Sequence, residues 1–197
     1  MLDFLEYEFM QRAFVASIIL GVVCSLIGVF IVLRGHAFLG AGVAHSAFAG
    51  AALGLLIGIN PFWTTLLFAV TTSLGIGYVE EKGAISSDVP IGILFSTAMA
   101  LAILFIGLMD SYTNEVYAVL FGNILAVSNE DFLYMIILSF IVIAVVILFF
   151  KEFEFITFDK EMAKIVGLPV VALSYLILVL MAMTIVVSIK SIGLSVF

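Results

Sequence analysis

The sequence predicts an all-α integral membrane protein, a polytopic bundle of about six spanning helices with one short re-entrant or half-length helix. Two observations predict this fold. Hydrophobic residues make up 65% of the 197 residues and charged residues 11%, whereas a soluble domain has about 45–50% and roughly 25%. Six windows also lack any Asp, Glu, Lys or Arg. This composition and the net charge of −7 exclude an ordinary soluble enzyme, a nucleic-acid-binding protein and a disordered chain.

The charge-free windows give the order of the expected spans within a single transmembrane domain, residues 1–197. They are Ala13–Leu33, Ala37–Ile59, Pro61–Val79, Val89–Met109, Phe132–Phe150 and Val170–Ile189. A charge at the centre of a span costs about 2.5–3.5 kcal/mol on insertion scales, so these windows are not expected by chance. A seventh apolar stretch, Val116–Val127, has 12 residues and is too short to cross. It predicts a re-entrant, surface or bundle-packed helix.

The basic residues of the loops predict the orientation in the membrane. If Val116–Val127 does not cross, five basic residues fall on one side and two on the other. The larger group is Arg34, Lys82, Lys151, Lys160 and Lys164, and the smaller group is Arg12 and Lys190. Because short cytoplasmic loops are enriched in Lys and Arg, we expect the larger group in the cytoplasm and the N-terminus outside.

The second window is unusually rich in small residues, since 13 of its 23 residues are Gly, Ala or Ser. Small residues recur at every fourth position and form one stripe along the helix: Gly42, Ser46, Gly50, Gly54 and Gly58. In a membrane such stripes allow helix backbones to approach closely. We therefore expect this helix to pack inside the bundle through these five residues.

Two polar residues are candidates for function, and a third is expected at the surface. His45 lies in the second window, and an intramembrane His either binds a metal along a path or hydrogen-bonds across helices to Ser, Thr or a carbonyl. Asp88 precedes the fourth window and is expected to cap that helix, and it is also a candidate metal ligand. His36, beside Arg34 at a helix end, is expected to be a solvated surface residue.

The polar segment before the last window predicts a short amphipathic helix over about residues 157–168. Asp159 can cap its start, Gly167 can end it, and Pro169 prevents its continuation. Lys160 and Lys164 share one face, and Met162, Ile165 and Val166 lie largely on another. This pattern fits either a helix resting on lipid headgroups or a helix that docks a cytoplasmic partner.

Four stretches together resemble one known family. The stretches are Arg34–Gly40 with Ala44–Ala47 and Gly50; Ser86–Asp88 with Ile91–Ser96; Leu120–Ser128 with Asp131; and Phe158, Asp159, Glu161, Ala163 with Gly167–Pro169. Each motif is short, and their order and spacing along the whole chain carry the resemblance. The chain resembles the membrane permease subunits of zinc- and manganese-uptake ABC transporters.

The resemblance implies a multi-pass protein of the cytoplasmic membrane that is not itself an enzyme. It implies a homodimer that binds two cytoplasmic ABC ATPase subunits and receives metal from an extracytoplasmic metal-binding protein. A divalent metal is then the transported substrate and no cofactor is tightly bound. The last stretch corresponds to the family's coupling helix, with Asp159, Glu161, Ala163 and Gly167 at the ATPase, and His45 becomes a transient ligand on the metal path.

Two departures from the family and three alternatives complete the expectations. Many members carry an acidic residue four positions before the matching His, but Ala41 stands there, which leaves the metal site incomplete and leaves zinc, manganese, iron or another substrate open. Members also continue into further helices, so we expect a C-terminal truncation. The main alternative is an ATP-independent secondary transporter or channel for a small ion. An intramembrane enzyme and a purely structural subunit are the others.

Overall fold

The computed structural model describes residues 8–36, 38–83, 88–109 and 129–192, and all regular structure in these ranges is helical. The helices are α1 (Glu8–Leu33), α2 (Leu39–Ile57), α3 (Pro61–Glu81), α4 (Asp88–Gly107), α6 (Asn129–Leu148), α7 (Phe150–Phe158), α8 (Lys160–Ile165) and α9 (Val170–Ile192). The predicted all-α membrane fold is confirmed. The short helix expected at Val116–Val127 lies outside the described residues.

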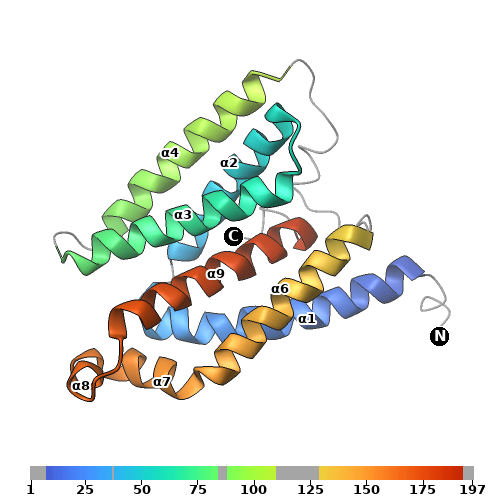
Figure 1. The fold of residues 1–197 in the computed structure, drawn as a ribbon. Helices are drawn as coiled ribbons and strands as arrows, with labels where there is room; N and C mark the ends of the chain where they lie inside the picture. The colour runs from blue at the N-terminus through green and yellow to red at the C-terminus, as the bar shows by residue number, and fades with distance from the viewer. Residues whose placement is uncertain (1–7, 37, 84–87, 110–128, 193–197) are drawn as a thin grey trace.

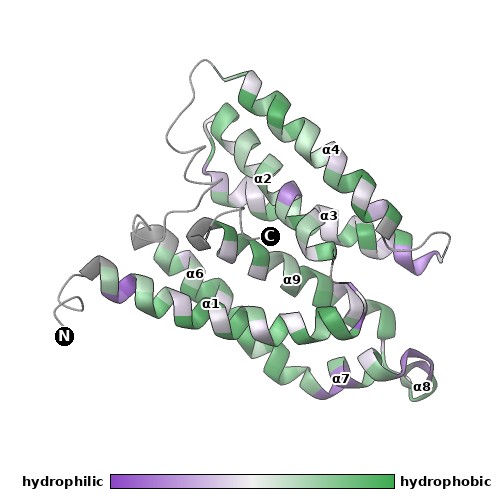
Figure 2. Ribbon diagram, turned by 180° about the vertical axis from the view of Figure 1, so that it is seen from behind, coloured by the Kyte–Doolittle hydropathy of each residue, from purple (hydrophilic) through white to green (hydrophobic). Residues whose placement is uncertain are grey.

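Among the helices that the structure describes, five are long and apolar enough to cross a membrane: α1, α2, α3, α4 and α9. Helix α6 is followed by α7 at a bend of 67°, and together they form a sixth candidate span. No feature of the charge-free windows predicted α7 as a separate helix. It carries Lys151, Glu152 and Glu154 among its first residues but buries Phe153 and Ile156 completely. Because charged side chains are costly inside the membrane, the charges of α7 favour a bend between it and the apolar helix α6. Figure 2 shows hydrophilic residues on α7 and α8.

The bundle consists of two groups of helices that meet at α9 (Figure 1). Helix α2 packs against both α3 and α4, and α9 contacts α3 on one side and α1 and α6 on the other. Most of α2 and α9 is buried, whereas most of α1 and α4 faces outward. Large apolar side chains such as Val29, Ile103 and Ile147 are therefore exposed, as expected for surfaces that lipid covers.

The small-residue stripe of α2 lies against its neighbouring helices. A Cβ atom on Gly50 would lie 2.5 Å from the backbone oxygen of Thr64 in α3. A Cβ on Gly54 would collide with the Thr64 side chain, and one on Gly42 would lie 3.0 Å from Ile91 in α4. The hydroxyl of Ser46 lies 2.5 Å from that of Thr72 in α3. The missing side chains are what lets α2 approach both helices.

Gly58 does not pack in this way, so its expected place in the stripe is wrong. It follows the end of α2 at φ +70°, and no atom would lie within 4 Å of a Cβ placed there. The backbone N–H groups of Gly58 and Ile59 both donate to the Gly54 carbonyl. Gly58 therefore ends the helix, because glycine adopts a left-handed conformation without steric cost.

We expect Gly50→Ala to destabilise the protein by about 1–3 kcal/mol, because the new methyl group overlaps backbone atoms of α3 that cannot rotate away. Thermal unfolding in detergent measures this effect. Gly75→Ala is the matched control, since it lies within a helix with no atom inside 4 Å of its added Cβ. Equal unfolding temperatures for the two variants would refute the close-packing role of Gly50.

Candidate functional site

His45 lies at the contact between α2 and α4. Its side chain is half-buried, its Nδ1 is 3.0 Å from the sulfur of Met99, and its ring meets Phe95 edge-on at a centroid distance of 4.4 Å. The contact with Met99 places a second soft ligand beside the imidazole. Ala41, one turn earlier, supplies no carboxylate. A cation beside His45 could thus contact an imidazole nitrogen and a thioether from this chain.

The second candidate ligand, Asp88, is not close to His45. Asp88 begins α4, whereas His45 contacts Met99, eleven residues later in the same helix. At a rise of 1.5 Å per residue this separates them by about 16 Å along the axis. The Asp88 side chain is outside the described part of the chain. Within that part, no three His, Cys, Asp or Glu side chains gather to hold a metal.

The helix predicted near residues 157–168 is α8, which is shorter than expected. Asp159 caps it, since its carboxylate accepts a hydrogen bond of 2.8 Å from the N–H of Met162. Gly167, at φ +88°, follows its end, and the N–H groups of Gly167 and Leu168 donate to the carbonyls of Lys164 and Ala163. This paired arrangement is a Schellman motif.

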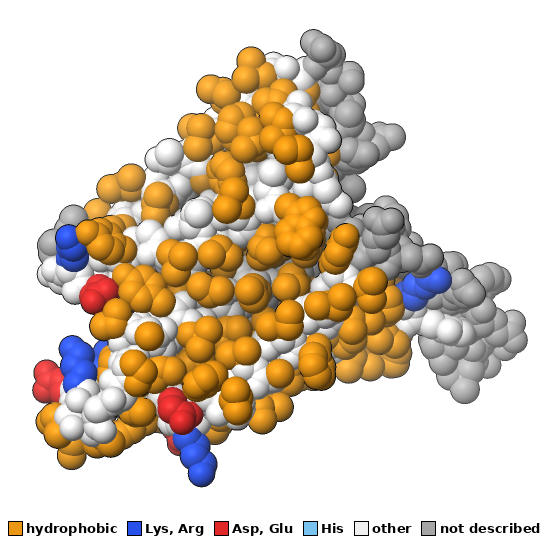
Figure 3. Space-filling view, in the orientation of Figure 1, with side chains coloured by type: hydrophobic (Ala, Val, Ile, Leu, Met, Phe, Trp, Pro, Cys, Tyr) orange, Lys and Arg blue, Asp and Glu red, His pale blue; other side chains and the backbone are white. Residues whose placement is uncertain are grey.

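The faces of α8 are clearly divided. Ala163 is fully buried against the bundle, whereas Glu161 is exposed. Ile165 is 79% exposed and Met162 is exposed in the same helix, and Phe158 and Val166 are exposed just before and just after it. The helix therefore presents an apolar surface away from the bundle, next to the charged side chains that gather at this end of the molecule (Figure 3).

His36 is buried, and the expectation of a solvated surface residue is wrong. The backbone turns back after α1 at Gly35, φ +76°, in a second Schellman motif. This turn directs His36 against the end of α3, where its Nε2 lies 3.1 Å from a carboxylate oxygen of Glu80. The other oxygen of Glu80 lies 3.7 Å from the Nζ of Lys160 in α8.

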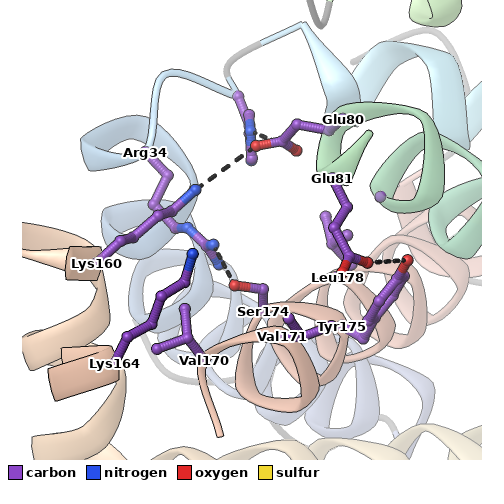
Figure 4. A pocket seen from close by; sticks show the side chains of 12 residues that line it. Arg34, Glu80, Glu81, Lys160, Lys164, Val170, Val171, Ser174, Tyr175 and Leu178 are labelled. Carbon is purple, nitrogen blue, oxygen red and sulfur yellow. Dashed lines mark hydrogen bonds and ion pairs between the residues drawn. The ribbon is translucent and has the colours of Figure 1, made fainter. Parts of the chain in front are cut away.

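A polar pocket of about 220 Å³ lies between these groups, α8 and the start of α9. Figure 4 shows Arg34, Lys160 and Lys164 extending toward the same part of it. Arg34 donates one hydrogen bond of 2.7 Å to Ser174, and Tyr175 donates one of 3.0 Å to Glu81. Burial lowers the pKa of the Arg34 guanidinium, whereas the negative charge of Glu80 raises it. The guanidinium stays charged, because arginine is not deprotonated in proteins.

Sequence reasoning missed most residues of this pocket. Glu80, Ser174 and Tyr175 have no motif, and they meet only because α3 and α9 pack side by side. Met99 was also missed, since nothing about a methionine in an apolar window indicates that it contacts His45. One signal was present: Glu80 and Glu81 directly follow the third window, on the side of the membrane where Arg34 and Lys160 are expected.

Comparison with known proteins gives consistent matches along the chain. Residues 6–196 match the sequence model of the ABC 3 transport family. The chain is 38% identical over 190 residues to the manganese transport system membrane protein MntC of Listeria monocytogenes, covering 96% of this chain and 68% of that protein. It is 32% identical over 187 residues to the chelated iron transport system membrane protein YfeD of Yersinia pestis, covering 95% of this chain and 63% of that protein.

Among solved structures, PsaBC from Streptococcus pneumoniae in complex with Fab matches with a TM-score of 0.84 and 32% identity. The match covers 98% of this chain and 70% of that one. The chain thus spans about two thirds of the length of these relatives.

Glu80 joins α3 to His36 and to α8, so we expect Glu80→Gln to destabilise the protein by about 1–3 kcal/mol. Its loss leaves a buried imidazole without its charged partner. Thermal unfolding measures the change, and Glu154→Gln, an exposed glutamate on α7, is the control. An unfolding temperature for Glu80→Gln as high as that of the control would contradict a stabilising role for this contact.

Proposed function

Because the chain belongs to the ABC 3 transport family, as its sequence motifs predicted, we propose that it is the permease subunit of an ATP-driven importer of a divalent metal cation. The observation that carries this proposal is the similarity to manganese transport proteins over nearly the whole chain. A separate cytoplasmic ATPase supplies the energy, and an extracytoplasmic metal-binding protein delivers the cation. Two copies of the permease enclose the path across the membrane.

Manganese is the favoured substrate, with iron second, because the relatives' names include both metals and the higher identity is to a manganese protein. Zinc is less directly supported. The pair of His45 and Met99 suits borderline and soft cations better than Mn²⁺, which prefers oxygen ligands. Weak binding at this point is compatible with transport, since a site that binds too tightly traps its ion.

His45 acts as a transient ligand on this path. We expect His45→Ala to lower metal uptake by roughly tenfold or more at limiting metal, because an imidazole ligand is lost. Uptake of ⁵⁴Mn into cells that express the complete transporter measures the effect, and co-purification of the subunits checks assembly. Uptake equal to the wild type at every metal concentration would remove His45 from the path.

Met99→Leu separates the chemical role of this contact from its packing role. Leu keeps the approximate volume of Met but lacks the sulfur, so unchanged uptake assigns Met99 to packing. A selective loss for one metal assigns the thioether to metal selection. Asp88 remains a weaker candidate. It lies at the start of α4, far from His45, so the two residues could bind the same ion only in a different conformation of the protein.

Docking to the ATPase occurs on α8. The apolar surface formed by Phe158, Ile165 and Val166 supports this, since exposed apolar groups at the charged end of a membrane protein are typical of an interface. Asp159 and Gly167 fix the ends of the helix, and Glu161 lies exposed beside the apolar surface. Ala163 acts from beneath, because its small side chain lets α8 lie close to the bundle.

We expect Ile165→Asp to reduce co-purification of the ATPase by roughly tenfold or more, because a charge replaces an apolar contact at the centre of the interface. Lys151→Gln is the control, since it makes the same change in net charge at an exposed position of α7. Retained co-purification with Ile165→Asp would count against α8 as the docking helix. Ala163 is unsuitable for this test, because a larger residue there would disturb the fold.

A further inference from the structure

The pocket beside α8 is separate from the His45 region and contains more positive charge than its carboxylates neutralise. Glu80 faces His36 and Lys160, and Glu81 accepts a hydrogen bond from Tyr175. Among the described residues, neither Arg34 nor Lys164 has a carboxylate within 4.0 Å. Two cationic side chains therefore line the pocket without a direct anionic partner.

Three side-chain nitrogens of the pocket are buried, and a buried polar atom without a hydrogen-bond partner is costly. Within the described part of the chain, Nε and Nη1 of Arg34 are buried and have no hydrogen-bond partner. The same is true of Nδ1 of His36, whose side chain is only 5% exposed. These three nitrogens belong to residues that line one pocket.

The start of α9 adds to this arrangement. Val170 and Val171, in its first turn, line the pocket together with Ser174. The N-terminus of a long helix carries a partial positive charge and favours anions. The Arg34 guanidinium has two nitrogens, Nε and Nη1, without hydrogen-bond partners, and the planar fork of a guanidinium matches the oxygen atoms of a phosphate in particular.

We propose that this pocket binds the phosphate group of an anionic ligand, between the Arg34 guanidinium, the Lys164 ammonium and the first turn of α9. The pocket volume of about 220 Å³ is large enough for a phosphate group, since it equals the volume of several water molecules at about 30 Å³ each. The phosphate comes either from the headgroup of an anionic phospholipid or from free inorganic phosphate. A bound phosphate bridges α8 to α9 and to the turn before α2.

The experiment has two arms, which distinguish the sources of the phosphate. In the first, the purified protein in uncharged detergent is titrated with ³²P-labelled inorganic phosphate at constant ionic strength. In the second, the protein is released from nanodiscs of mixed phosphatidylglycerol and phosphatidylcholine, and native mass spectrometry counts the retained lipids. Saturable binding near one phosphate, or selective retention of phosphatidylglycerol, supports the site and identifies the source.

The variants are chosen to shift binding in opposite directions. We expect Arg34→Gln to weaken binding by roughly tenfold or more, since charge-assisted hydrogen bonds are lost. Lys164→Gln, at an exposed position, weakens it by about two- to fivefold. Glu81→Gln removes a negative charge from the pocket and tightens binding. Lys151→Gln, outside the pocket, leaves it unchanged.

Three results would overturn the proposal. One is the absence of binding in both arms, which would mean that no phosphate group binds at Arg34. Another is an equal loss of affinity with Lys164→Gln and with Lys151→Gln, which would indicate general attraction to a basic surface. The third is failure of Glu81→Gln to tighten binding. If Arg34→Gln does not fold, Lys164→Gln and Glu81→Gln still decide the question, because both positions are at the rim.

Discussion

The close approach of α2 to α3 is the contact on which the rest of the bundle depends. Apolar side chains gain little from leaving lipid for one another, so spanning helices associate mainly through packing and hydrogen bonds. Here Gly50 and Gly54 provide the packing, and the Ser46–Thr72 contact provides a polar link. Because α2 also contacts α4 and α9, fixing it fixes the centre of the bundle, and His45 is held there with it.

Charged side chains are costly within the membrane, and most of those that the structure describes gather at one end of the bundle. Two glycine turns make that gathering compact. Gly35 directs His36 inward beneath α3, and Gly167 reverses the chain from α8 into α9. The result joins residues that are far apart in sequence, so that Arg34 donates to Ser174 across 140 positions. The same concentration of charge places three cationic side chains, those of Arg34, Lys160 and Lys164, around a pocket that holds two carboxylates.

The spans were predictable because a charge-free window needs only composition to identify it. The ends of α8 were also predictable, because Asp159 and Gly167 act on their own neighbouring backbone. The environment of His36 was not, because burial depends on which helix end packs beside the turn. Gly58 was misassigned for a related reason. A four-residue repeat continues across a helix end, and the repeat itself does not show where the helix stops.

The strengths of these contacts indicate how α8 is connected to α2. The direct polar link runs from Lys160 through Glu80 to His36, but Lys160 is half-exposed, and such pairs contribute about 0–1 kcal/mol. Ala163, in contrast, is fully buried, and the Gly167 turn joins α8 tightly to α9. Helix α9 then contacts α3 closely, with Ser73 donating 2.7 Å to the Leu178 carbonyl. A displacement of α8 would therefore reach α2 mainly through the packed contacts of α9 and α3, and only secondarily through the ion pair.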